Sequence, residues 1–138
     1  MDARLIRFLP TAIGITALLL AGASALAATP AEMLAGYTAK AGAPAQPEKG
    51  QAFFNKNFGR EMGFSCSSCH TPNPTRLGRD QVTEKSIQPL APAANPARFT
   101  DAQKTNFHFD LNCKDVVGRV CTPAEKADIL AWLLTLKP

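Results

Sequence analysis

Apolar side chains recur with the spacing of an α-helix in four stretches of the 138-residue sequence. Helices are predicted from Thr29 to Gly42, from Glu48 to Asn57, from Thr100 to Asn112 and from Thr122 towards the C-terminus. The last of these is apolar over more than half of its surface, so we expect it to be the most buried helix of the fold. The sequence has no internal repeat and no low-complexity tract.

Three of the predicted helices begin with a capping box, in which Ser or Thr is followed three residues later by Glu or Gln. The pairs are Thr29 with Glu32, Thr100 with Gln103 and Thr122 with Glu125. In the second helix Gly50 stands at an interior position, where glycine costs about 1 kcal/mol relative to alanine. Gly50 therefore predicts a point at which another helix approaches closely.

Residues 1–27 have the pattern of an export signal. Two arginines near the start precede a long uncharged run, and this run ends in Ala-Leu-Ala, with small residues where a signal peptidase reads. We predict a signal peptide that is cleaved after Ala27 and a periplasmic protein with a single domain, residues 28–138. The alternative is a retained N-terminal membrane anchor, because the run is nearly long enough to span a bilayer.

The chemistry of the chain centres on the motif Cys66-Ser67-Ser68-Cys69-His70, the attachment signature of a c-type haem. On a helical turn, positions i, i+3 and i+4 share one face. Cys66 and Cys69 can then bond haem vinyl groups as thioethers, with His70 as the proximal iron ligand. The alternatives are a disulfide or a zinc site. No second zinc-type pair exists, since Cys113 and Cys121 are eight positions apart, and no β-α-β pattern suggests a thioredoxin-like site.

Residues 71–99 lose regular periodicity and form a predicted long loop. Prolines and a glycine punctuate it: Pro72, Pro74, Gly78, Pro89, Pro92 and Pro96. Loops of this length are usually functional or disordered, and here a haem can serve as the surface against which the loop packs, with Ile87 and Leu90 as contacts. Lys85 and Arg98 are candidate partners for the haem propionates, although solvated surface charge is the more common role of each taken singly.

The charge of the chain is modest. The formal net charge is +4, from 15 basic and 11 acidic residues. Without Arg4, Arg7 and Asp2 of the predicted signal peptide the balance is 13 to 10, or +3. Two haem propionates bring the total to about +1. A charge this small argues against nucleic-acid binding.

The layout resembles a class I cytochrome c: a helix with glycine and aromatic residues, then Cys-x-x-Cys-His, then a last helix with Trp132. In that fold the first and last helices cross, with a glycine of one under an aromatic residue of the other, and Gly50 and Trp132 match those roles. The resemblance implies an all-α fold of four to five helices and a long proline-rich loop around one covalent haem c.

The sixth iron ligand departs from the common class I pattern, which places a methionine well after the haem motif. No methionine follows His70, and Met33 and Met62 are predicted to be packing residues. The later sequence is instead similar to the SHP-type cytochromes c, the sphaeroides haem protein family, in residues 83–92 and 95–101.

The most specific part of this resemblance is Asn112-Cys113 together with Cys121. By that resemblance Asn112 is the distal iron ligand, and Cys113 and Cys121 form a disulfide. An amide is a weak neutral ligand that ferric iron tolerates better than ferrous iron. Reduction should weaken the bond and open a position for oxygen, nitric oxide or carbon monoxide, as the family implies. The alternative is that Asn112 is only a helix C-terminal residue, but the adjacent cysteine and the missing methionine favour ligation.

His108 is the competing distal residue because it lies one helical turn before Asn112, so both can face the same way. Direct ligation by His108 would give a closed bis-histidine haem, with His70 and His108, that only transfers electrons. His108 can also hydrogen-bond a bound diatomic, or simply line the pocket, which we favour. The SHP-type pattern usually has an aromatic residue near this position, so the chain departs from the family here.

Two function classes follow: an electron carrier with a displaceable ligand, and a protein that binds or detoxifies diatomic gases. An enzyme in the strict sense, such as a peroxidase, ranks third, since no arginine and histidine pair is placed for that chemistry. The family resemblance implies a redox partner protein, for example a dihaem c-type cytochrome near the membrane.

Overall fold

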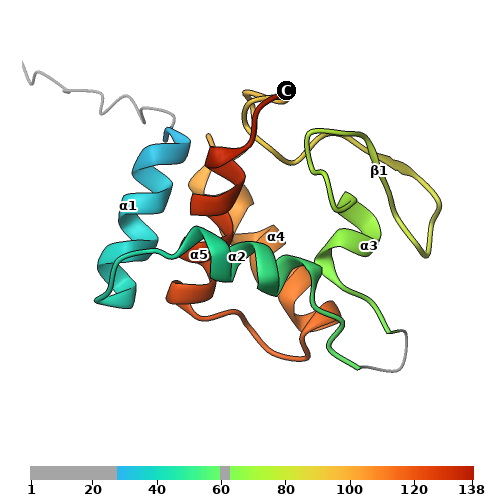
Figure 1. The fold of residues 1–138 in the computed structure, drawn as a ribbon, viewed down its shortest axis with the longest axis horizontal. Coiled ribbons are helices and arrows are strands. Elements are labelled where there is room, and N and C mark those ends of the chain that lie inside the picture. Colours follow the sequence, from blue (N-terminus) through green and yellow to red (C-terminus); the bar gives the residue numbers. More distant parts are fainter. Residues whose placement is uncertain (1–27, 60–62) are drawn as a thin grey trace, which may run out of the picture.

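A computed structural model describes residues 28–59 and 63–138. Within these residues the chain forms five helices and one two-stranded sheet (Figure 1): α1 (Pro30–Ala41), α2 (Pro47–Asn55), α3 (Cys66–His70), β1 (Gly78–Arg79), β2 (Ser86–Ile87), α4 (Ala102–Val116) and α5 (Pro123–Thr135). The predicted all-α class is confirmed. The predicted signal peptide and Met62 lie outside the described residues.

Two of the three predicted capping boxes are present. Thr29 Oγ1 accepts a hydrogen bond from the Glu32 amide, and the Glu32 carboxylate accepts one from the Thr29 amide at 2.7 Å. Thr122 and Glu125 make the same reciprocal bonds at the start of α5. Each box satisfies backbone donors that a helix leaves unpaired at its first turn, so the local sequence is sufficient to place these two starts.

Helix α4 differs at both ends from the helix predicted between Thr100 and Asn112. Asp101, not Thr100, is the N-cap of α4, and its carboxylate accepts a hydrogen bond from the Lys104 amide at 2.9 Å. The helix continues beyond Asn112 to Val116, so Cys113 belongs to its last turn rather than to a loop. The irregular segment between Cys113 and Cys121 therefore begins only after Val116. A buried Cys113 side chain supports this extra turn.

The core is built around α5, as predicted. Seven of its 13 residues are buried, and α1 and α2 pack against it. The buried cluster comprises Met33, Tyr37, Phe54, Phe99, Ala127, Ile129, Leu130, Trp132 and Leu133. Met33 is therefore a packing residue, as expected. No helix in the described part of the chain has the length and apolar character needed to cross a membrane.

The crossing of α2 and α5 confirms the role predicted for Gly50. A side-chain carbon built at Gly50 would overlap the backbone carbonyl of Asp128. The neighbour of Gly50 is thus the α5 backbone at Asp128 and Ile129, rather than Trp132. Trp132 lies one turn further along α5 and packs on Phe54 of α2, with ring centres 5.0 Å apart.

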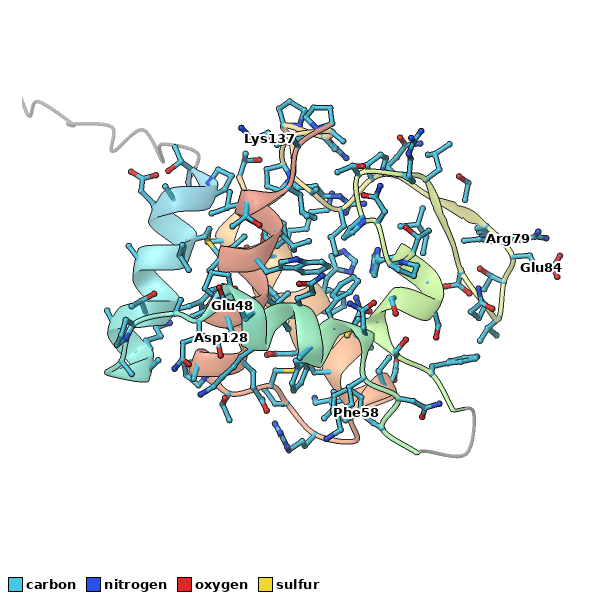
Figure 2. The ribbon with its side chains drawn as sticks, viewed as in Figure 1. Glu48, Phe58, Arg79, Glu84, Asp128 and Lys137 are labelled. Carbon is cyan, nitrogen blue, oxygen red and sulfur yellow. A yellow bond between two sulfur atoms is a disulfide. The ribbon has the colours of Figure 1, made fainter. Side chains whose placement is uncertain are left out.

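The segment between α3 and α4 contains a small sheet that the sequence did not predict. β1 and β2 pair antiparallel, with Gly78 opposite Ile87. Arg79 and Glu84 form an ion pair of 2.8 Å, and Figure 2 shows both side chains at the outer edge of the molecule. The carbonyl of Pro74, which precedes β1, accepts hydrogen bonds from two backbone amides that follow β2. These bonds order a segment that carries little sequence periodicity.

Candidate functional site

The Cys-x-x-Cys-His motif forms the short helix α3 (Figure 1). Its start is fixed locally, because the Ser65 amide donates a hydrogen bond to Ser68 Oγ at 3.0 Å. Cys66, Cys69 and His70 therefore occupy positions i, i+3 and i+4 of a helical turn, as predicted. This spacing presents two sulfur atoms and an imidazole to one side.

The β1–β2 hairpin packs against the back of α3. A side-chain carbon built at Gly78 would overlap the Cys69 carbonyl, so only glycine permits this approach. Gln81 Nε2 donates a hydrogen bond to the Ser68 carbonyl at 2.9 Å. These contacts hold the C-terminal end of α3, where His70 lies, against the following segment.

His70 is largely buried, and its Nδ1 atom is buried with no hydrogen-bond partner among the described residues. Its ring lies 6.3 Å from that of Phe54. Burial, assisted by the positive charge of Arg98, lowers the pKa of His70 to about 4. The imidazole is therefore neutral near pH 7, which is the form that ligates a metal.

The two motif cysteines are unpaired in the structure and partly buried. The disulfide interpretation of this pair is therefore not realised here. Burial raises the pKa of Cys66 to about 11, with a smaller contribution from Cys69. Cys66 is thus a neutral thiol near pH 7, and both sulfurs remain available for covalent bonds to another group.

Helix α4 has two distinct faces. Asn106, Phe109, Asp110 and Cys113 follow helical spacing and turn towards α1 and α5; we call this the anchored face. Phe107, His108, Leu111 and Asn112 form the distal face, and all four side chains are exposed. The structure thus places His108 and Asn112 on one face of a helix, as the sequence predicted.

Cys113 and Cys121 come together at the end of α4. Both are buried, their sulfur atoms lie at bonding distance and their α-carbons are 5.6 Å apart. This separation lies within the range of 4.4–6.8 Å that a disulfide requires. The residue beside Asn112 is therefore held close to the start of α5.

Of the two predicted propionate partners, Arg98 differs from a solvated surface charge. It is partly buried, and its guanidinium donates hydrogen bonds to the Pro89 carbonyl at 2.9 Å and the Gln88 carbonyl at 2.7 Å. Arg98 is therefore bound to the backbone and only partly open to solvent. Lys85 is exposed, in keeping with a solvated surface charge.

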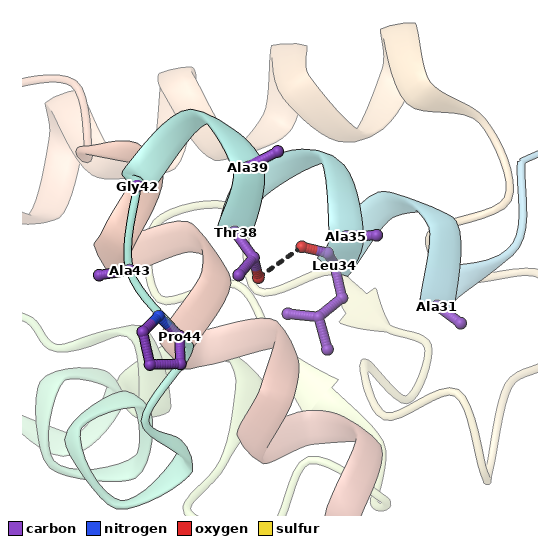
Figure 3. Close-up of a pocket in the computed structure, with 8 residues that line it drawn as sticks. All are labelled: Ala31, Leu34, Ala35, Thr38, Ala39, Gly42, Ala43 and Pro44. Atoms are coloured by element: carbon purple, nitrogen blue, oxygen red, sulfur yellow. Dashed lines mark hydrogen bonds between the residues drawn. The ribbon is translucent and has the colours of Figure 1, made fainter.

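A shallow apolar hollow of about 690 Å³ lies along α1 and the residues that follow it (Figure 3). It is lined by Ala31, Leu34, Ala35, Thr38, Ala39, Gly42, Ala43 and Pro44, and Thr38 Oγ1 within it donates to the Leu34 carbonyl at 2.8 Å. None of these side chains titrates or ligates metals. The chemistry lies with α3 and α4 instead.

Comparison with known proteins agrees with this arrangement. Residues 40–133 match the family described as Domain of unknown function (DUF1924). The chain is 49% identical over 107 residues to the cytochrome c-type protein SHP of Cereibacter sphaeroides, covering 76% of this chain and 82% of that protein. The chain belongs to the SHP family of c-type cytochromes.

Solved structures give the same assignment. The structure of oxidized SHP, described as an oxygen binding cytochrome c, superposes with a TM-score of 0.75 at 46% identity, covering 80% of this chain and 99% of the other. The solution structure of Methylophilus methylotrophus cytochrome c'' gives 0.69 at 39% identity, covering 79% and 94%. The predicted cytochrome c fold and the predicted family are confirmed.

As an SHP-type cytochrome, the protein carries a covalently bound haem c. The described residues fit such a group. His70 presents a buried ring nitrogen without a partner, and two unpaired cysteine sulfurs lie on the same helical turn. On the distal face, Phe107 and Leu111 are 62% and 43% exposed, as suits side chains that an apolar macrocycle would cover.

Sequence reasoning missed two features of this SHP-type site. One is the buried Lys126 on α5, which pairs with Asp110 on the anchored face. The signal that could have identified it is a lysine within a helix that is otherwise apolar over most of its surface. The other is the packing of Gly78 on Cys69, for which an isolated glycine in a loop gives no specific signal.

Proposed function

We propose that the protein is an exported electron-transfer cytochrome whose distal ligand, Asn112, leaves the iron on reduction and so admits oxygen, nitric oxide or carbon monoxide. The observation that carries this proposal is the position of Asn112. It is an amide on the exposed face of a helix whose opposite face is fixed, next to Cys113. The relatives of this chain include an oxygen binding cytochrome c and a protein whose structure is described in terms of haem-ligand detachment.

In this proposal Cys66 and Cys69 hold the haem as thioethers and His70 is the proximal ligand. The bound haem supplies one-electron chemistry and one further coordination position. The burial of His70 suits this role, because a neutral imidazole is available throughout the physiological pH range. Arg98 is held by two backbone carbonyls beside His70, which makes it the better candidate than Lys85 for pairing with a propionate.

Asn112 supplies the gating property. A neutral amide oxygen is a hard, weak donor that favours the ferric ion over the ferrous ion. Cys113, one residue later, is buried and fixes the backbone. The amide can therefore leave and return while the helix stays in place.

A closed bis-histidine carrier is the second candidate function. It is favoured by one observation, the exposure of His108 on the same face, one turn before Asn112. Ligation by His70 and His108 would leave no position for a gas. A third form of the hypothesis, gas detoxification, requires the same open position as the first and differs in that the protein would consume nitric oxide or oxygen with turnover.

We further propose that residues 1–27 are removed on export to the periplasm, that 28–138 is a single monohaem domain, and that Cys113 and Cys121 form a disulfide there. The Cα separation of 5.6 Å supports the bridge, and oxidising compartments outside the cytoplasm allow it. The mass of the protein purified from the periplasm tests all three. A retained N-terminal segment would favour the membrane-anchored alternative.

A redox partner protein is part of the proposal, and a dihaem c-type cytochrome near the membrane is our choice by family resemblance. Stopped-flow reduction by such a cytochrome tests it. Rates that do not depend on the partner concentration would exclude this assignment and leave the gas-binding proposal intact.

Optical spectra of two variants decide between the candidate functions. Asn112→Ala should open the ferric iron to water or added ligands, while His108→Ala should leave the ferric spectrum largely unchanged and alter only the affinity for bound gas. The wild-type ferrous protein should bind carbon monoxide readily. The reverse pattern, in which only His108→Ala changes the ferric spectrum, would make the protein a closed electron carrier.

A further inference from the structure

A buried lysine holds the helix that carries Asn112 from its opposite side. Lys126 of α5 is 8% exposed, which is unusual for a lysine unless it is paired. Its ammonium donates to Asp110 Oδ1 at 2.6 Å and lies 5.8 Å from the ring centres of both Tyr37 and Phe109. Asp110 and Phe109 belong to α4 and Tyr37 to α1, so this one side chain joins three helices.

Tyr37 provides a second attachment, one helical turn earlier on α4. Its hydroxyl donates a hydrogen bond to Asn106 Oδ1 at 2.9 Å. Burial, with the negative charge of Asp110, raises the pKa of Tyr37 to about 12, so the hydroxyl remains a donor at physiological pH. Its ring also meets Phe109 edge to face, with centres 5.8 Å apart. Both attachments reach α4 through its anchored face.

These attachments constrain the opposite face of the same helix. At 3.6 residues per turn, Asn112 is rotated by about 200° from Asp110 around the helix axis, so a contact at Asp110 determines where Asn112 points. Attachments at Asn106 and Asp110, one turn apart, also fix the position of α4 along its axis. A slip of one turn, about 5.4 Å, would bring His108 to the place of Asn112.

We propose that Lys126 and Tyr37 are positioning residues that hold α4 in the rotation and register in which Asn112, rather than His108, meets the iron. This inference rests on the proposed function of Asn112. It assigns the choice of distal ligand to contacts on the far side of the helix. It also explains a charged residue in the most buried helix, because a charge pair fixes register more specifically than apolar contacts do.

Titration of the ferric haem protein with imidazole tests this inference. Lys126→Met keeps the length of the side chain and removes the charge, and Tyr37→Phe removes only the hydroxyl. Imidazole competes with Asn112 for the iron, so weaker positioning of Asn112 should raise the apparent imidazole affinity. Loss of one attachment should raise it about fivefold, as expected for one ordinary hydrogen bond, and the double variant should show a larger rise.

The matched control is Arg79→Gln, which breaks an exposed ion pair on the hairpin and should leave the imidazole affinity unchanged. Thermal unfolding of every variant separates the inference from a purely structural role, which would lower the melting temperature without changing the imidazole affinity. If His108 takes the vacated position, imidazole affinity falls in Lys126→Met and rises again when His108→Ala is added, which also supports the inference.

Asn112→Ala, measured in parallel, distinguishes a failure of the positioning role from a failure of the proposed function of Asn112. If Asn112→Ala raises imidazole affinity and the Lys126 and Tyr37 variants match the wild type, the positioning role is overturned and the proposed function stands. If Asn112→Ala itself leaves the affinity unchanged, Asn112 is not the ligand, and both the proposed function and the positioning role are overturned.

Discussion

Gly50 lies against the backbone carbonyl of Asp128 so closely that any side chain at this position would overlap it. A second contact reinforces the approach. The backbone amide of Gln46, the N-cap residue of α2, donates a hydrogen bond to Asp128 Oδ1 at 2.6 Å. Figure 2 shows Asp128 beside Glu48, in the first turn of α2. The crossing of α2 and α5 is thus fixed by backbone contact, and it places Phe54 against both Trp132 and His70.

Gly50→Ala should therefore destabilise the protein, although alanine favours helices. Separating the two backbones should cost about 2 kcal/mol in free energy of unfolding, in the range of other overpacked cores. Gly36→Ala is the matched control, since Gly36 is also helical and has no neighbour within 4 Å. It should stabilise by about 0.5–1 kcal/mol. Urea unfolding of both variants measures the difference, and equal effects would contradict the close approach.

The stability of the fold in acid should depend on Arg98, because burial and, to a lesser extent, the positive charge of Arg98 lower the pKa of His70. The pKa of His70 in the folded protein is about 4, below the ordinary 6.5, so the neutral imidazole stabilises the fold fully above pH 6.5. This contribution is lost as the pH falls from 6.5 towards 4. Removing the nearby positive charge brings the folded pKa closer to 6.5 and so reduces the stability that is lost in acid. The acid unfolding transition should therefore move to lower pH in Arg98→Gln.

Arg98→Lys keeps the charge and loses the two-carbonyl geometry of the guanidinium. Its acid unfolding transition, followed by far-ultraviolet circular dichroism, should stay nearer to that of the wild type. If both substitutions move the transition equally, the hydrogen bonds to Gln88 and Pro89 decide the acid stability rather than the charge.

The proposed disulfide should contribute to stability. Closing the loop from Cys113 to Cys121, a separation of eight residues, restricts the unfolded chain by about 2.5 kcal/mol in the chain-entropy model. The double variant Cys113→Ser/Cys121→Ser should lose about that much free energy of unfolding in urea. Alkylation of the unreduced wild type should modify neither cysteine. Two reactive thiols in the periplasmic protein would show that the bridge does not form.

Covalent attachment through α3 can be tested by extraction. Acid acetone should leave the haem with the denatured protein, because thioether bonds survive denaturation. Either Cys66→Ala or Cys69→Ala should leave a haem with a single thioether, which a pyridine haemochrome spectrum distinguishes from a haem with two. Haem released from the wild type into the solvent would contradict the attachment.

Short-range chemistry explains most of what could be predicted for this protein. The capping boxes at Thr29 and Thr122 each depend on hydrogen bonds within four residues, and both were predicted correctly. The box at Thr100 failed because the neighbouring Asp101 offers a carboxylate to the same backbone donors, while Thr100 Oγ1 donates instead to the Ala97 carbonyl at 2.9 Å. When two good N-cap residues are adjacent, the local sequence does not determine which of them caps the helix.

The haem motif and the family were evident from the sequence by itself, because covalent attachment requires a fixed spacing of Cys66, Cys69 and His70 along the chain. The tertiary structure decided what spacing does not encode. It extended α4 past Asn112, brought Lys126 of α5 to Asp110, and turned Arg98 from solvent to the carbonyls of Gln88 and Pro89. Each of these depends on partners distant in the sequence or on backbone groups that no side-chain pattern records, and the free energy of burying a charge is favourable only when such partners are in place.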